Sequence, residues 1–284
     1  MDDAQDGRAA QDRDAAHPAA ADAPLLTERH GAVLVLTLNR PEKLNALNPA
    51  IFESLGQAVR AYADDSSLRV CLLRATGRYF CAGADLLGGT AVPRTESTAA
   101  IRHWYRTTLG PGMQALYDDM EAIEKPFVAA HHAPCVGGGL ELSLACDFRL
   151  AARSAHYTFP EAKLGAIPAS GGVSRLTRLV GAHWAKWMIL ANEPVDAARA
   201  LAIGLVHDVY EDAGFEESVF AFCERLSQVP PEMCAMAKLT IGLIEDAAPD
   251  HARRIERLGQ SVLEVGCESA DLLATMQTRL KRRA

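Results

Sequence analysis

The segment Val136-Gly137-Gly138-Gly139-Leu140-Glu141-Leu142, which continues to Asp147 as VGGGLELSLACD, is the stretch that decides the fold of this chain. Three glycines before an apolar run predict a helix whose first N–H groups are exposed at the positive end of its dipole. Such a helix start stabilises negative charge on a phosphate or a developing oxyanion. The segment lacks the Gly-x-Gly-x-x-Gly and Gly-Lys-Ser/Thr patterns of dinucleotide and nucleoside-triphosphate sites. It therefore predicts an anion site built from backbone amides.

Two glutamates stand beside glycine-rich turns in this part of the chain. Glu141 lies in the first turn of the expected helix, where a carboxylate can simply stabilise the helix dipole. Glu161 follows twenty residues later, after a β-like stretch, and precedes a second glycine-rich turn at 165–172. Two carboxylates from separate elements beside two such turns predict an acid–base site with an anion pocket.

The surrounding pattern alternates apolar β-rich runs with helical stretches, which indicates an α/β fold with a largely parallel sheet. We expect an N-cap at Asn48, with Pro49 at the first helical position. Expected strands cover 33–38, 68–75, 127–130, 148–152 and 205–210. Expected helices cover 49–62, 98–123, 139–146, 172–180, 183–191 and 196–203, and an all-helical end follows at 214–228, 231–245, 248–267 and 270–281.

Charge is unevenly distributed along the 284 residues, whose formal net charge is -7. Residues 1–24 carry six Asp and two Arg among nine Ala, and therefore hold -4 of that charge. We expect this segment to be a disordered acidic tail, because it has almost no residues that a core could use. The remaining acidic body argues against a nucleic-acid partner.

Membrane and compartment signals also restrict the function. No apolar run reaches the 18 or so residues that a membrane span needs, and the first residues lack the apolar stretch of a signal peptide. Seven scattered cysteines without a CxxC pair predict reduced thiols, and hence a cytoplasmic location. We therefore expect no membrane partner. We also expect no metal site, because His131-His132 has no third ligand at a useful spacing and is typical of a strand end.

Several motifs together resemble the enoyl-CoA hydratase/isomerase (crotonase) superfamily, from about residue 26 to the C-terminus. They are FCAGADL at 80–86, VGGGLELSLACD at 136–147, FPEAKLGAIPASGG at 159–172, NRPEKLNALN at 39–48 and GLV at 204–206. The resemblance implies a crotonase-like ββα spiral over 25–210 as the catalytic core. It also implies a helical C-terminal region at 211–284 that mediates trimerisation, giving a homotrimer or a dimer of trimers.

The resemblance also implies a set of site residues. The backbone N–H groups of Ala84 and Gly138 would form an oxyanion hole for an acyl-CoA thioester. Glu141 would help to activate a water, and Glu161 would hold it and deliver a proton to the α-carbon. The CoA-binding stretches would contribute Lys43, Leu44, Ala46, Ala82, Asp85 and Leu86, and Trp104 is a candidate for the acyl pocket. CoA is part of the substrate, so no separate cofactor is expected.

The implied activity is hydration of a trans-2-enoyl-CoA to a 3-hydroxyacyl-CoA, or the reverse dehydration. The alternatives are another acyl-CoA reaction, such as enoyl-CoA isomerisation or hydroxyacyl-CoA cleavage, and more remotely a non-catalytic RNA-binding or scaffold relative. The chain departs from the family pattern at Ala133 and at Ala169, each of which stands where many members have glycine. The stretch 88–109 matches the region that varies with acyl specificity, and Lys43 and the terminal 281–283 are candidate cations for the CoA phosphates.

Overall fold

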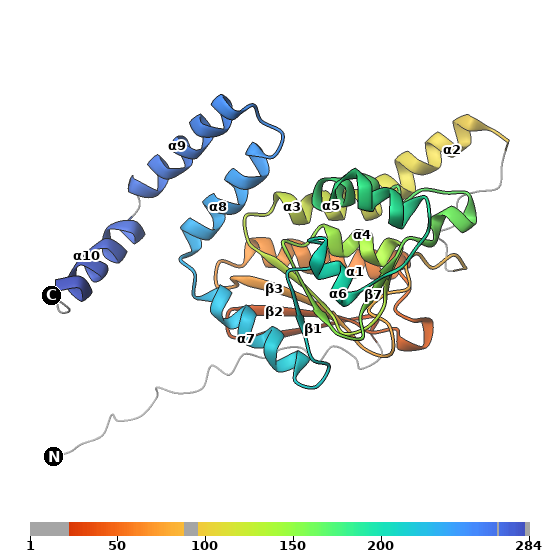
Figure 1. Cartoon of the computed structure of the whole chain (residues 1–284), viewed down its shortest axis with the longest axis horizontal. Coiled ribbons are helices and arrows are strands. Elements are labelled where there is room, and N and C mark those ends of the chain that lie inside the picture. The colour runs from red at the N-terminus through yellow and green to blue at the C-terminus, as the bar shows by residue number, and fades with distance from the viewer. Residues whose placement is uncertain (1–22, 88–95, 266, 282–284) are drawn as a thin grey trace, which may run out of the picture.

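The computed structural model describes residues 23–87, 96–265 and 267–281, and centres on a six-stranded sheet (Figure 1). The strand order is β1-β2-β3-β4-β6-β9. Only β1 runs antiparallel to its neighbour, and the other pairs are parallel. The strands are β1 Leu25–His30, β2 Val33–Leu38, β3 Val70–Ala75, β4 Phe127–His131, β6 Phe148–Ala152 and β9 Asp208–Tyr210. The predicted α/β class with a largely parallel sheet is therefore confirmed.

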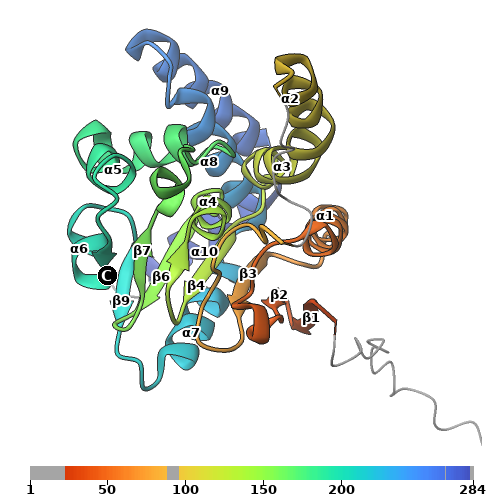
Figure 2. The ribbon, with the colours of Figure 1, turned by 90° about the vertical axis from the view of Figure 1, so that its right-hand side faces the viewer.

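Alternate residues of the central strands enter two different hydrophobic clusters, one on each face of the sheet. In β2, Leu34, Leu36 and Leu38 belong to the cluster beneath most of the helices, whereas Val33 and Val35 belong to the cluster beneath α7 (Phe215–Ser227). Helices thus cover both faces, and Figure 2 shows α7 on the side of the sheet opposite to α1 (Pro49–Asp64) and α4 (Gly138–Leu144). Burial on both faces explains why these strands are continuous apolar runs.

A smaller sheet and short helices build the edge that carries the glycine-rich turns. The smaller sheet has the order β5-β7-β8, with β5 at Cys135–Val136, β7 at His156–Thr158 and β8 at Val195–Asp196. The predicted cap of α1 is confirmed, since the Asn48 side chain accepts a hydrogen bond from the N–H of Ile51. The remaining helices of the body are α2 Thr98–Trp104, α3 Ala115–Ala122, α5 Gly172–Ile189 and α6 Ala197–Ala202, with 3-10 turns at Pro41–Lys43 and Pro160–Leu164.

The helical end divides at the close of α7. Phe215, Val219 and Cys223 of α7 lie in the core beneath the main sheet, so this helix packs on the body of its own chain. Helices α8 (Pro231–Ile244), α9 (Pro249–Val265) and α10 (Cys267–Lys281) instead extend away from it and pack mainly on one another (Figure 1). We call α8–α10 the C-terminal arm. The domain division at residue 210 stays a prediction.

Some local features differ from the sequence expectations, and other expectations fall outside the described residues. β1 was not expected, because four of its six residues are exposed on an edge strand and give no apolar alternation. The single helix expected over 98–123 is interrupted by a π-helix at Tyr105–Gln114, which separates α2 from α3. The segment 1–22, residues 88–95 of the expected acyl region and the terminal 282–283 lie outside the described residues. No described helix has the length and apolar character needed to cross a bilayer.

Candidate active site

The N-terminus of α4 is packed so closely that its glycines cannot be replaced without displacing neighbours. A methyl group added at Gly139 would lie 2.5 Å from Cβ of Cys81, and Gly137 has a positive φ of 51°. Gly138 begins the helix, one residue before the start predicted from the sequence, and its N–H has no partner within the helix. The strand-to-helix turn therefore presents backbone amides rather than side chains.

The loop that carries Ala84 lies directly against this helix start. A methyl group on Gly138 would be 3.4 Å from the amide nitrogen of Ala84, and one on Gly83 would be 3.2 Å from that of Gly138. The N–H of Val136 donates to Cys81 O at 2.9 Å and fixes the two segments side by side. The structure thus brings together the two amides that the sequence assigned to the oxyanion hole.

Glu141 is buried, with 4% of its surface exposed, in the first turn of α4. Its Oε1 accepts two backbone hydrogen bonds, from the N–H of Ser170 at 2.7 Å and from that of Gly172 at 3.0 Å. Burial nevertheless raises the pKa of Glu141 to about 7, and the charge of Glu161 raises it as well. The group can therefore gain and lose a proton near neutral pH.

Glu161 enters the same region from the 3-10 turn Pro160–Leu164. Its Oε1 lies over Gly137, where an added methyl group would be only 2.8 Å away. Burial raises the pKa of this carboxyl too. Its Oε2 is buried without a hydrogen-bond partner among the described residues. A buried oxygen without a partner is costly for the fold, and is typical of an atom that serves a bound molecule.

The two stretches expected to carry CoA are joined by backbone hydrogen bonds. Ala82 N donates to Leu44 O, Leu47 N to Gly83 O and Asp85 N to Leu47 O, at 2.7–3.0 Å. The carboxylate of Asp85 forms an ion pair with Arg40 at 3.1 Å, so its side chain is engaged in holding the loop. Any contribution of Asp85 to ligand binding would come through its backbone.

The other predicted contact residues lie around this strip. Lys43 is exposed at the end of the turn Pro41–Lys43, Leu44 and Ala46 are partly buried, and Leu86 is half exposed. Trp104 is partly buried at the end of α2, where its ring packs edge-on against Tyr105. The roles of these residues stay predictions.

Several residues that shape the site were missed by sequence reasoning. Asn45 is fully buried in a left-handed conformation, and its side chain bonds to backbone atoms of Arg40, Thr76 and Tyr79. The polar Asn45 within the otherwise apolar Leu44–Leu47 was the available signal. Ser170 lies in the glycine-rich turn that the sequence predicts at 165–172, but no sequence signal shows that its N–H binds Glu141. Among the described residues no group of three His, Cys, Asp or Glu side chains is arranged to hold a metal ion.

Comparisons with known proteins identify the family of the chain. Residues 28–256 match the family model of enoyl-CoA hydratase/isomerase. The chain is 34% identical to a 2,3-dehydroadipyl-CoA hydratase of Escherichia coli K12 over 79% of this chain and 84% of that protein. It is 36% identical to a crotonyl-CoA hydratase of Syntrophomonas wolfei over 66% of this chain and 69% of that protein.

Solved structures with the same fold include enoyl-CoA hydratases from two further bacteria. The enzyme from Bacillus anthracis superimposes with a TM-score of 0.82 at 28% identity, covering 90% of this chain and 96% of the other. The enzyme from Mycobacterium smegmatis gives a TM-score of 0.83 at 26% identity, with the same coverage. The ββα crotonase fold expected from the sequence is thereby confirmed, and the chain belongs to the enoyl-CoA hydratase/isomerase family.

Proposed function

We propose that this protein hydrates a trans-2-enoyl-CoA to a 3-hydroxyacyl-CoA, and catalyses the reverse dehydration. The observation that carries the proposal is the pair of glutamates, Glu141 and Glu161, both buried enough to have raised pKa values, at the helix start that holds Gly138. Two carboxyl groups of this kind can exchange protons with one water molecule near neutral pH.

In the proposed reaction the thioester oxygen accepts hydrogen bonds from the N–H groups of Ala84 and Gly138. These donors stabilise the enolate that forms when the water oxygen bonds to the β-carbon. Glu141, whose Oε1 is already held by two N–H donors, takes a proton from the water. Glu161 gives a proton to the α-carbon, so the elements of one water molecule are added across the double bond. The two glutamates then return to their starting protonation states by proton exchange with each other or with solvent.

The substrate class is supported by the relatives, whose names specify hydratases of enoyl-CoA thioesters. The hydrogen-bonded strip of Leu44–Leu47 and Ala82–Asp85 would bind the CoA portion, with Lys43 near its phosphates. No separate cofactor is required, because CoA arrives as part of the substrate. We place the reaction in the cytoplasm on the basis of the scattered, unpaired cysteines of the sequence.

Isomerisation within the same family is the second candidate, since it needs only one proton-transferring glutamate. The presence of both glutamates at the site favours hydration. Purified protein incubated with crotonyl-CoA in H₂¹⁸O separates the two reactions, because hydration incorporates ¹⁸O at the β-carbon and isomerisation incorporates none.

Mutation of each glutamate tests the proposed roles. Glu141→Gln and Glu161→Gln should each lower kcat for crotonyl-CoA at least about 10³-fold while leaving the dissociation constant of a CoA thioester within a few-fold. Glu217→Gln, at an exposed position on α7, is the matched control and should leave kcat unchanged. Retained activity in either site variant would contradict the two-glutamate mechanism.

We propose further that the protein is a trimer, assembled through the C-terminal arm. Large apolar side chains are exposed on α8 and α9, including Ile241 at 65%, Leu243 at 66% and Leu258 at 68%. A groove of about 800 Å³ separates α8 from the body and is lined largely by apolar residues of both. Apolar faces of this extent favour burial against another subunit, and a second copy of the chain is the occupant that we assign to the groove.

A further inference from the structure

The carboxylate of Glu141 is held by a short turn, 168–172, rather than by other side chains. Both hydrogen bonds to its Oε1 come from this turn, through the N–H groups of Ser170 and Gly172. A methyl group at Gly172 would lie 2.9 Å from the same oxygen. The position and charge of Glu141 therefore depend on how firmly this turn is fixed.

Arg175, in the first turns of α5, supports the opposite side of that turn. Its Nη1 donates to the carbonyl of Ser170 at 3.3 Å, so one residue binds Glu141 through its N–H and Arg175 through its oxygen. The guanidinium also fills the space above Gly171, where an added Cβ would be only 1.8 Å from Nη1. Gln114 of the π-helix also holds the 168–172 turn, since its side chain donates a hydrogen bond to Ala169 O at 2.9 Å.

Two acids on α3 fix Arg175 in turn. Its Nε and Nη2 bind the two carboxylate oxygens of Glu121, each at 2.7 Å, and Nη2 also binds Asp118 at 2.7 Å. The side chain of Arg175 is only 11% exposed, and these carboxylates raise its pKa above the ordinary value. Such a bidentate pair holds the guanidinium in one orientation and keeps it charged.

Two nearby charges act on the pKa of Glu141 in opposite directions. Glu161 raises the pKa of Glu141, whereas the positive charge of Arg175 lowers it. Tyr117 of α3 also interacts electrostatically with Glu141, and its hydroxyl donates to Gly138 O at 3.3 Å. Arg175 also lines a polar pocket, together with Glu121, Arg149, Arg178 and Glu245 among others.

We propose that Arg175 is a positioning residue for the hydration reaction. Clamped by Glu121 and Asp118, it fixes the turn that presents two N–H donors to Glu141 and so holds the Glu141 carboxyl in place for the water. This role rests on the hydratase function proposed above, and adds to it a chain of contacts that runs from α3 through α5 to α4.

The test replaces Arg175 by Met and follows both activity and the titration of Glu141. We expect kcat for crotonyl-CoA to fall about 10²-fold with KM nearly unchanged. The acid limb of the pH profile should move to higher pH, because Glu141 loses a favourable positive charge and stays protonated longer. Arg175→Lys should recover part of kcat, since it restores the charge without the two-pronged contact.

Arg178→Met is the matched control. Arg178 lies one turn further along α5 and pairs with Glu245 and Asp246 instead of the 168–172 turn, so its loss should change neither kcat nor the pH limb. If Arg175→Met does not fold, Arg175→Gln removes the same positive charge with a polar side chain and should shift the acid limb in the same direction.

A second measurement separates this inference from the proposed function. Carboxyl ¹³C NMR of labelled Glu141, assigned by its loss in Glu141→Gln, reports the pKa even if the protein turns over no enoyl-CoA. A pKa of Glu141 that is higher in Arg175→Met than in the wild type supports the positioning role. An unchanged pKa, or a shift of the same size in Arg178→Met, overturns it.

Discussion

The surroundings of Glu141 act on its ionised form in both directions. Two backbone N–H donors and the charge of Arg175 favour its ionised form, whereas burial and Glu161 favour the protonated form, and burial is the largest of these effects. Moving the pKa from 4.5 to about 7 corresponds to roughly 3 kcal/mol, at 1.36 kcal/mol for each pKa unit. A carboxyl group that titrates near neutral pH is thus obtained at the expense of stability.

Because the raised pKa of Glu141 lowers stability at neutral pH, the difference in free energy of unfolding between the wild type and Glu141→Gln should depend on pH. Because the pKa of Glu141 is raised on folding, the folded chain binds the proton more tightly, and stability falls as pH rises from about 4.5 to about 7. Glu141→Gln keeps an acceptor oxygen but cannot ionise. Relative to the wild type it should therefore gain up to about 3 kcal/mol between pH 4 and pH 8, as measured by urea unfolding. A difference that is independent of pH would show that Glu141 titrates normally.

Gly137 gives a second test at the level of one residue. Gly137→Ala forces a side chain into a left-handed conformation and places a methyl group 2.8 Å from Oε1 of Glu161, so kcat should fall about 10²-fold. Gly31→Ala is the control, because Gly31 also has a positive φ, 60°, but has no atoms within 4 Å of the added methyl group. Gly31→Ala should lose about 1 kcal/mol of stability, and Gly137→Ala should lose more, because its methyl group also displaces Glu161. Equal loss of activity in the two would contradict a specific effect on Glu161.

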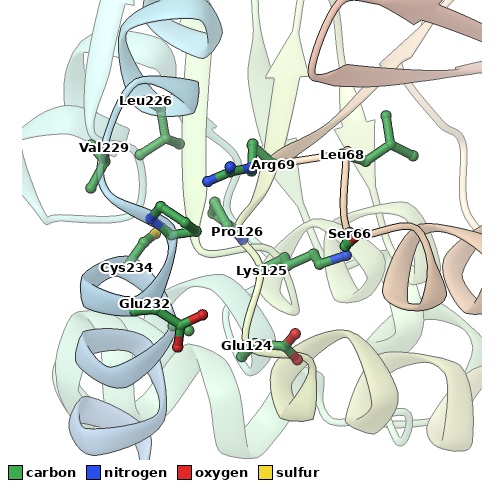
Figure 3. Close-up of a pocket in the computed structure, with 12 residues that line it drawn as sticks. Ser66, Leu68, Arg69, Glu124, Lys125, Pro126, Leu226, Val229, Glu232 and Cys234 are labelled. Carbon is green, nitrogen blue, oxygen red and sulfur yellow. The ribbon is translucent and has the colours of Figure 1, made fainter. Parts of the chain in front are cut away.

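Among the elements, α8 is attached to the body partly through one side chain, Lys238. Lys238 reaches from α8 into the body, where its Nζ bonds to Met120 O, Lys125 O and Asp147, all at 2.9–3.0 Å. Near the base of α8 a pocket of about 210 Å³ lies between this region and the loop before β3; Figure 3 shows Glu232 and Cys234 on one side of it and Lys125 on another. The arm therefore contacts the body through hydrogen bonds and an ion pair of Lys238 rather than through a continuous hydrophobic core.

Loss of the Lys238 contacts should loosen the arm. Lys238→Met leaves Asp147 without its ion-pair partner, and we expect a loss of about 2 kcal/mol in the free energy of unfolding. Faster limited proteolysis within α8 and α9 should accompany it. Lys186→Met, at an exposed position on α5, is the control and should change neither measurement. Unaltered proteolysis of Lys238→Met would show that other contacts hold α8.

Much of the element order and the core of the site could be predicted from the sequence. Buried strands such as Val70–Ala75 are continuous apolar runs, and Gly137–Glu141 combines a helix start with a chemical motif. The edge strand β1 could not be predicted, because most of its side chains face solvent and its sequence shows no alternation of apolar and polar residues. The support of Glu141 by Ser170 and Arg175 was also hidden, since it uses backbone atoms and depends on contacts between distant residues, Ser170 with Glu141 and Arg175 with Glu121.

At the scale of the whole molecule, helices cover both faces of the body's sheet, whereas the arm extends away from the body (Figure 1). The arm leaves large apolar side chains exposed. If the arm assembles a trimer, light scattering after size exclusion should give three times the chain mass of 30.5 kDa. Ile241→Glu should shift the protein towards monomer, because it places a charge in the proposed interface. Leu190→Glu, at an exposed site on the body, should leave the trimer intact. A monomeric wild type would contradict the proposed assembly.

The account depends above all on two glutamates acting on one water molecule. The measurement that tests it most directly is mass spectrometry of the product formed from crotonyl-CoA in H₂¹⁸O by the wild type, Glu141→Gln and Glu161→Gln proteins. We predict a 3-hydroxyacyl-CoA that carries one ¹⁸O with the wild type, and almost none with either variant at equal protein concentration. Wild-type turnover without ¹⁸O, or undiminished labelling by one of the variants, would contradict the account.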